Sequence, residues 1–404
     1  MKNVTTQRLR RLCVTAQFCL GLIFYVLACT VIIPLAFLGA KIIEICGFSS
    51  TPYKAAAGSV WLSFSKALVF ILVGDKSCIF YDKKLKNAKG KALVISNHIS
   101  YLDWMFVWNS LLALGKESII FIAKKDVGVF FLVLGIKLLN FILLDRNIES
   151  DKKNLSSACE HMKKLSSYAL VLFPEGTFID RKTHKRDKIY LEKELALKDQ
   201  RTAKPEERNN HMPVETTEHN HNVLFPRPKG FNLIVNEIGK LDYMINCTLY
   251  LRTPNNEFPS EYFTIEKMVQ GLCNDYEMVM IYEHEEITPE MTAESASWLY
   301  KKFSDKDKLL SQLKGLKKHE IKLLLAQSND TQYEMLTPAT GVGYSIFLSL
   351  GSLFVLCSLV FLATMGGKKA FKGLVFLWNK VFSSGRVWRV LGLSNRLPTE
   401  LFSN

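Results

Sequence analysis

The chain has 404 residues, 48% of them hydrophobic, and its 52 Lys and Arg against 38 Asp and Glu give a formal net charge of +14. This length exceeds one average domain, and the charge excludes a simple acidic soluble domain. Because the apolar residues are concentrated in long uncharged runs, the composition also argues against a freely soluble protein.

The first uncharged run covers residues 12–40 and follows a basic N-terminus. A straight helix of these 29 residues would be about 43 Å long, well over the roughly 30 Å hydrocarbon core of a bilayer. We therefore expect a membrane-embedded helix that tilts or, as we prefer, kinks near Pro34. A cleaved signal peptide is the weaker alternative, since its apolar part would be only about 7–15 residues long.

A second uncharged run, residues 335–367, contains an apolar stretch at 344–365 that is long enough for one membrane span. Lysines follow it directly, so the positive-inside rule places the C-terminus in the cytosol, as the basic start does for the N-terminus. An even number of crossings is then needed, but the remaining apolar segments, 60–73 and 129–144, are weak. Two topologies stay open: a re-entrant N-terminal pair, or a single crossing that leaves the middle of the chain in the lumen.

Between these runs, strand-like and helix-like segments alternate. Short apolar stretches at 92–96, 118–123, 141–144 and 169–173 resemble buried strands, and residues 102–114 and 155–165 have helical length. This alternation predicts an α/β layer with parallel strands. Further along, we expect a strand at 243–251 and an amphipathic helix at 295–313.

Residues 181–222 interrupt the alternation, because they are charged and polar and can bury little. We interpret them as a long solvated insertion. Its histidines, His211, His219 and His221, match no zinc-binding spacing, so we expect no metal site there. The nine cysteines include no Cys-x-x-Cys pair, which favours reduced, structural thiols.

His98 is the first candidate for chemistry, because it stands at the end of a predicted strand with Asp103 five residues later. A strand that opens into a helix is where α/β proteins present reactive groups. The Asp103 carboxylate would accept the Nδ1 proton of His98 and leave Nε2 as a general base. A helix cap beside a solvated histidine is an equally good interpretation of this pair alone.

A second candidate is the turn Phe173-Pro174-Glu175-Gly176-Thr177, again at a strand end. Glycine lets a ligand approach the backbone, and exposed amides with the Thr177 hydroxyl suit phosphate oxygens. Together, Asn97-His98 with Asp103 and the FPEGT string resemble the glycerolipid acyltransferases, which esterify lysophospholipids from acyl-CoA. Five specified residues rarely recur by chance in a chain of this length, so the joint match is specific.

Further stretches strengthen the resemblance, which covers roughly residues 93–310. Residues 124–146 look like the second block of the family, and 224–231 look like its fourth block in the eukaryotic form. Residues 103–109 and 298–307 are most similar to the lysocardiolipin and lysophosphatidylinositol acyltransferase branch. Two features depart from the family pattern: Phe178 stands where some relatives have a charged residue, and the polar insertion is longer than usual. A role for Arg181 is therefore not inferred from the family.

The resemblance implies a reaction without a covalent enzyme intermediate, with His98 and Asp103 as the catalytic dyad. A thiolate is a good leaving group, and the absence of Gly-x-Ser-x-Gly counts against a nucleophile-elbow hydrolase. The residues implied to hold the acceptor phosphate are Arg146, Glu175, Gly176 and Thr177, with Lys125 a weaker candidate. A backbone amide near His98 or within the fourth block would stabilise the oxyanion, which makes Pro226, Lys229 and Gly230 candidates; for Lys229, packing or solvation is an equal alternative.

We therefore expect an α/β acyltransferase domain with a membrane-embedded N-terminal helix or helix pair and a C-terminal transmembrane helix. The expected divisions are residues 1–75 in the membrane, 76–315 as the acyltransferase domain, 316–340 as a linker, 341–367 as the C-terminal span and 368–404 as a basic tail. The location would be the endoplasmic reticulum membrane, with several crossings.

The expected substrates are acyl-CoA, as a co-substrate rather than a cofactor, and an anionic lysophospholipid: lysophosphatidylinositol, lysophosphatidic acid or lysocardiolipin. The positive charge also fits an anionic membrane surface, and no motif supports nucleic-acid binding. The alternatives are a catalytically inactive membrane scaffold of the same fold and, less well supported, a phospholipid hydrolase. Oligomeric state stays open.

Overall fold

The computed structural model describes residues 76–336 apart from 117, 125–140, 146–147, 199–219, 255–256, 271, 274–275 and 328–330, together with part of 12–50. Its strands are β1 (Ser77–Asp82), β2 (Lys91–Ser96), β3 (Ile119–Lys124), β4 (Ile142–Leu144), β5 (Tyr168–Leu172), β6 (Tyr243–Arg252), β7 (Glu277–Glu285) and β8 (Tyr333–Leu336). The longer helices are α2 (Ile33–Ile45), α5 (Asp103–Ala113), α7 (Ile148–Lys163), α8 (Arg181–Lys198), α10 (Pro228–Ile238), α14 (Ser295–Leu313) and α15 (Lys318–Gln327). The short helices are α4 (Lys84–Asn87), α11 (Pro259–Tyr262), α12 (Ile265–Val269) and α13 (Pro289–Ala293).

The strands form one mixed sheet in the order β4-β3-β5-β2-β6-β7-β1-β8. All pairings from β4 to β6 are parallel, as the alternating sequence pattern predicts. The β6–β7 and β1–β8 pairings are antiparallel and were not predicted. Because parallel strands end at the same edge of a sheet, the carboxyl ends of β2 and β5 lie side by side, with Ile95 opposite Leu172.

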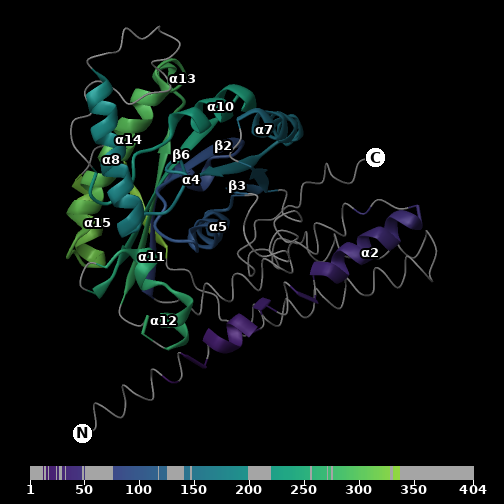
Figure 1. The fold of residues 1–404 in the computed structure, drawn as a ribbon, viewed down its shortest axis with the longest axis horizontal. Helices are drawn as coiled ribbons and strands as arrows, with labels where there is room; N and C mark the ends of the chain where they lie inside the picture. The colour runs from purple at the N-terminus through teal and green to yellow at the C-terminus, as the bar shows by residue number, and fades with distance from the viewer. Residues whose placement is uncertain are drawn as a thin grey trace.

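Helices cover both faces of the sheet (Figure 1), and β2 shows why. Val94 joins a core with α5 on one face, whereas Leu93 and Ile95 join a core with α7, α10, α14 and α15 on the other. A strand buried on both faces has apolar residues at successive positions rather than alternating ones. The sequence ALVIS has this property, so its burial in a three-layer fold follows from its composition.

Two segments differ from their expected form. The first part of the insertion, 181–198, is the helix α8, and Thr183, Asp187 and Leu191 are buried on it although the segment is strongly charged. The expected linker contains α15 and β8, and β8 pairs with β1. Burial of a few side chains at helical spacing is enough to attach a polar helix, which average composition does not reveal.

The expectation of membrane-spanning helices is wrong for the part of the chain that the structure describes, where no helix is both long and apolar enough to cross a bilayer. The helix α2 has 13 residues and contains Pro34 in its first turn, so it extends about 20 Å against a hydrocarbon core of roughly 30 Å. The expected C-terminal span at 341–367, the segment 60–73 and the tail 368–404 lie outside the described residues.

Candidate active site

The turn that carries His98 is fixed to the sheet through the residue before it. The Asn97 side chain donates its Nδ2 hydrogen to the Leu249 carbonyl (2.9 Å) and accepts from the Leu249 amide (2.7 Å) on β6. Asn97 is completely buried, so both bonds are shielded from water. The side chain therefore continues the β2–β6 pairing one residue beyond β2 and determines where the chain leaves the sheet.

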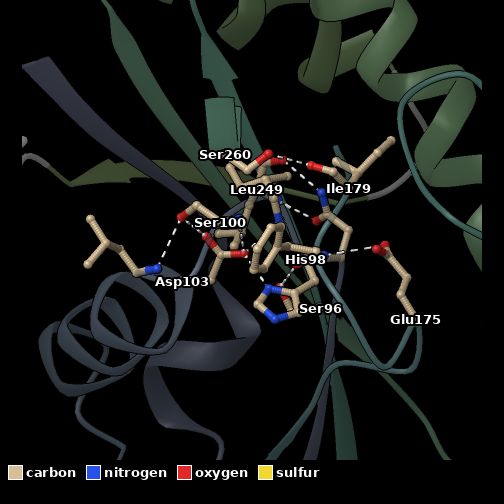
Figure 2. A network of polar contacts seen from close by, with 12 residues as sticks. Ser96, His98, Ser100, Asp103, Glu175, Ile179, Leu249 and Ser260 are labelled. Carbon is tan, nitrogen blue, oxygen red and sulfur yellow. Dashed lines mark hydrogen bonds and ion pairs between the residues drawn. The ribbon is translucent and has the colours of Figure 1, made fainter. Parts of the chain in front are cut away.

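His98 and Asp103 are in direct contact, as Figure 2 shows: the Nδ1 atom lies 2.8 Å from Oδ2 of Asp103. The same oxygen accepts the amide hydrogens of Ile99 (2.5 Å) and Ser100 (3.0 Å), and Oδ1 accepts from the Ser100 hydroxyl (2.7 Å). An ionised carboxylate can only accept, so Nδ1 carries the shared hydrogen and Nε2 is left as the basic atom. Asp103 is completely buried at the start of α5, which holds this geometry rigid.

Two aromatic rings flank the imidazole. Phe173 is stacked on it at a centroid distance of 4.5 Å, and Phe178 meets it edge-on at 5.7 Å. Both rings belong to the FPEGT turn or follow it, and the His98 side chain keeps 20% of its surface exposed. The rings restrict the imidazole to one orientation and leave part of it accessible to a substrate.

The FPEGT turn follows β5, the strand next to β2, and contacts the backbone of His98. Gly176 has φ +73°, a conformation that a side chain would strain, and its amide donates to the Phe173 carbonyl (3.0 Å). The Glu175 carboxyl accepts the His98 amide hydrogen at 3.3 Å (Figure 2), and the Ile179 amide donates to the His98 carbonyl at 2.9 Å. The two motifs are thus joined through backbone groups on both sides of His98.

Glu175 itself is buried beneath the turn, whereas Gly176 is exposed and Thr177 half-buried. Burial raises the pKa of Glu175 well above its usual range, and the nearby Asp103 and Asp187 carboxylates add to this. The His98 amide and the Lys306 ammonium act in the opposite direction. Among the described residues, its Oε2 atom has no hydrogen-bond partner, so the carboxyl supports the turn from below.

The segment before α10 is bound to the same turn. The Arg227 amide donates to the Pro174 carbonyl (2.7 Å), and Asp187 of α8 accepts from the Phe225 amide (2.8 Å) and from the Arg227 guanidinium (3.3 Å). Pro226 is buried between these contacts. Burial raises the pKa of Asp187, while the bond from Phe225 and the charge of Arg227 oppose the shift.

A buried lysine lies under the carboxyl end of the sheet. Lys306 of α14 donates to the Cys247 carbonyl (2.5 Å) and lies 3.4 Å from the Thr248 hydroxyl, and only 2% of its surface is exposed. Burial lowers its pKa to about 8, against the attraction of Cys247, Glu283, Glu285 and Glu175. Cys247 pairs with Ser96 in the sheet, so the ammonium is one strand away from the His98 turn.

Two cavities adjoin this turn. One of about 190 Å³ is lined by Ile99, Ile179, Leu249 and Phe258, with Arg252 and Lys314 among its polar residues. The other, about 420 Å³ and open to solvent, is lined by Phe178, Asp180, Arg181, Lys182, Lys185, Ser260 and Glu261. Apolar and cationic surfaces therefore lie on either side of the segment 176–181, close to the imidazole.

The structure brings some of the predicted site residues together and not others. His98, Asp103 and the Glu175-Gly176-Thr177 turn meet, and Pro226 lies next to that turn. Lys229 and Gly230 are exposed in the first turn of α10, and none of the described contacts joins them to His98. Lys125 and Arg146 lie outside the described residues. Within the described part of the chain, no cluster of side chains is suited to a metal ion.

Sequence reasoning missed the supporting roles of Asn97, Phe178, Asp187 and Lys306. For Lys306 a signal exists, because it occupies an apolar position of α14, in line with Phe303 and Leu310, which are both buried. A lysine in an apolar stripe indicates a buried partner. No comparable pattern identifies Asp187, whose partners lie far along the chain.

Comparison with known proteins adds an independent result. The family model described as Acyltransferase matches residues 78–203. An uncharacterized acyltransferase of Schizosaccharomyces pombe is 24% identical over 61% of this chain and 70% of its own length. Lysophosphatidylinositol acyltransferase 10 of Caenorhabditis elegans is 28% identical over 46% of this chain and 43% of its own length. 1-acyl-sn-glycerol-3-phosphate acyltransferase 2 of Brassica napus is 26% identical over 84% of this chain and 75% of its own length. The matched region contains both the His98 turn and the FPEGT turn.

Proposed function

The chain belongs to the glycerolipid acyltransferase family and is an O-acyltransferase, and from this premise we propose that it transfers a fatty acyl group from acyl-CoA to the free hydroxyl of an anionic lysophospholipid. The observation that carries the proposal is the 2.8 Å contact between His98 Nδ1 and the buried Asp103 carboxylate. It leaves Nε2 as the basic atom, and the residues next to the imidazole, Ile99, Phe178 and Ile179, line two cavities.

In the proposed reaction, Nε2 of His98 removes the proton from the acceptor hydroxyl as its oxygen attacks the thioester carbonyl carbon. The C–S bond then breaks, and the CoA thiolate leaves and takes up the proton from the imidazolium. Asp103 stabilises the imidazolium and keeps the ring oriented, and it does not need to be protonated itself. The products are the esterified phospholipid and free CoA, and no cofactor is required.

Negative charge develops on the carbonyl oxygen during the attack. Backbone amides stabilise such charge when they point to the position of the oxyanion. The amides of Ile99 and Ser100 are already directed at Asp103, and that of Ile179 at the His98 carbonyl. The amides of Gly176, Phe225 and Arg227 are engaged in the same way, and Pro226 has no amide hydrogen. This favours the amide of Thr177 or those of Lys229 and Gly230 in the first turn of α10.

Gly176 and Thr177 are proposed to contact the acceptor phosphate, because they are the accessible part of the turn, while Glu175 holds the turn in place. Arg146, with Lys125 as a second candidate, would supply positive charge, and a guanidinium can bind phosphate oxygens in pairs. Lysophosphatidylinositol and lysophosphatidic acid are the first acceptors proposed, with lysocardiolipin next. The proposed location is the endoplasmic reticulum membrane.

The proposal is tested by acyl transfer with His98→Ala. With labelled oleoyl-CoA and a panel of lysophospholipids, we expect kcat to fall about a hundredfold to ten-thousandfold, because a positioned base contributes that much. The products would be identified by mass spectrometry. Turnover unchanged in a variant expressed at the normal level would overturn the proposal.

Asp103→Asn separates an enzyme from an inactive scaffold. An amide cannot accept the Nδ1 hydrogen through its nitrogen, so an enzyme should lose most of its kcat, whereas a scaffold should keep its cellular role. Ser100→Ala is the matched control, because it removes one bond to Asp103 and leaves the bond to His98 intact. Release of fatty acid from a phospholipid in the absence of acyl-CoA would instead indicate a hydrolase.

A further inference from the structure

The short helix α12 is apolar on both sides, which is unusual for a surface helix. Its inner residue Met268 is buried, with 5% of its surface exposed. On the outer side, Ile265, Val269 and Leu272 are 57%, 39% and 50% exposed. Ile265 and Val269 are four residues apart in α12 and so lie on one face of the helix, and Leu272 follows three residues after the helix ends. Three large apolar side chains are thus exposed within one short stretch of the chain.

The inner side of this segment is firmly attached. Phe263, which is 1% exposed, packs against Tyr276 (4.9 Å between ring centroids) and Phe106 of α5 (6.4 Å). Thr264 caps α12 by accepting the Lys267 amide hydrogen. The Lys267 ammonium pairs with Glu257 at 2.7 Å. The outer face is therefore held on a rigid base, and its exposure is not the result of a loosely packed loop.

This segment is also connected directly to the active-site turn. The Tyr101 hydroxyl, two residues before Asp103, donates to the Phe263 carbonyl at 2.7 Å. The Ser260 hydroxyl of α11 donates to the Ile179 carbonyl at 2.8 Å (Figure 2), and the Ile179 amide donates to the His98 carbonyl at 2.9 Å. The apolar face thus has a fixed position relative to the imidazole.

Cationic residues lie beside the same segment. Ser260 and Glu261 line the open cavity together with Arg181, Lys182 and Lys185. Glu261 pairs with Arg181 at 3.5 Å. Within the described residues, Lys182 and Lys185 have no ion-pair partner, so their charge is available to an anionic surface. An apolar surface on α12, with cations beside the preceding helix α11, fits a bilayer surface, where anionic headgroups lie over an apolar interior.

We propose that the apolar surface formed by Ile265 and Val269 of α12, together with Leu272 just after the helix, docks onto the surface of a lipid bilayer that contains anionic lipids. Docking there would hold the His98 turn next to the layer in which a lysophospholipid resides. The acceptor would then reach Nε2 without passing through water. This inference rests on the proposed function only for the identity of the acceptor.

The kinetic test uses the full chain with the double substitution Ile265→Glu and Leu272→Glu. With the acceptor embedded in vesicles of phosphatidylcholine and phosphatidylserine, we expect its KM to rise about fivefold or more, because the apolar contact is replaced by charge. KM for a short-chain acceptor below its critical micelle concentration should stay unchanged. Leu323→Glu is the matched control, since Leu323 is 61% exposed on α15, whose core residues belong to the opposite face of the sheet.

A contact measurement decides the question independently of activity. A photoreactive phenylalanine analogue at Leu272 should form adducts with vesicle lipids, and the same analogue at Leu323 should form few. Equal adducts at both positions, adducts of Leu272 with a second copy of the chain, or a KM change shared by both acceptors would overturn the docking proposal. Absence of acyl transfer by the unaltered protein would contradict the proposed function, while the adducts would still test the docking.

Discussion

Among the single residues, Asp103 has the largest influence on the site, because its carboxylate accepts several hydrogen bonds at once. Oδ2 of Asp103 accepts from an imidazole and two backbone amides, and Oδ1 accepts from Ser100. Losing any one donor leaves the others to hold the carboxylate, whereas losing the carboxylate leaves buried amides unpaired. The geometry of the proposed catalytic pair and the local fold therefore depend on the same side chain.

Lys306 is the second residue on which a prediction rests. Burial lowers its pKa to about 8, whereas a lysine in the unfolded chain keeps its proton to about pH 10.4. Between these values the unfolded chain binds more protons than the folded one, so the contribution of Lys306 to stability increases with pH. Below pH 8 both states are protonated, and the full cost of burying the charge remains.

Lys306→Met should reveal this dependence. The difference in unfolding free energy, wild type minus variant, should increase from pH 8 to 10 by about 2 kcal/mol. Denaturant unfolding at several pH values measures it, and taking the difference cancels the tyrosines and cysteines that titrate in both proteins. A difference that falls or stays constant over this range would contradict the assignment. Lys301→Met, on the exposed side of α14, controls for the substitution itself.

At the scale of elements, parallel pairing is what assembles the site. The β2–β5 register puts Ile95 opposite Leu172, so the turns that follow both strands emerge together. The helix α8 then continues from the FPEGT turn and binds the segment before α10 through Asp187. Three stretches that are far apart in the chain, 97–103, 173–180 and 225–227, thereby contact one another at the site.

Asp187→Ala should weaken the attachment of residues 225–227 to α8. It leaves the buried Phe225 amide without its acceptor and removes the partner of Arg227, so we expect the unfolding free energy to fall by about 1–3 kcal/mol. Hydrogen exchange at the amides of Phe225 and Arg227 should become faster than elsewhere in the sheet. Lys188→Ala, on the neighbouring exposed position of α8, should change neither quantity. Unaltered exchange at Phe225 would show that Asp187 does not hold this segment.

At the scale of the whole molecule, stability comes from two cores on opposite faces of one sheet. The core with α5 lies next to the His98 turn, and the core with α7, α10 and α14 lies behind it. Phe303 is completely buried in the second core, near the sheet positions that Lys306 contacts. The second core therefore supports the strands that carry the site from the face opposite α5.

Phe303→Ala should lower the unfolding free energy by about 3–5 kcal/mol, because a large buried ring is replaced by a cavity. Urea unfolding followed by circular dichroism measures the change. Leu323→Ala, at an exposed position, should stay within about 0.5 kcal/mol of the wild type. A small effect of Phe303→Ala would mean that the second core is loosely packed.

The local features could be predicted from the amino-acid sequence: the strands around β2 and β5, the helix at 295–313, and the two motifs at strand ends. These depend on residues close in the chain, whose apolar runs and turn residues have short-range causes. The pairing of His98 with Asp103 was predictable for the same reason, because only five residues separate them.

Which distant groups meet became known from the packing of the folded chain. The antiparallel strands β7 and β8, the burial of Lys306, the Asp187 contacts and the outward apolar face of α12 all depend on packing between remote segments. The polar composition of 181–198 did not reveal α8, because a few buried contacts outweigh the average. Local preferences are set by neighbours in sequence, whereas burial is set by neighbours in space, and the support of the site belongs to the second kind.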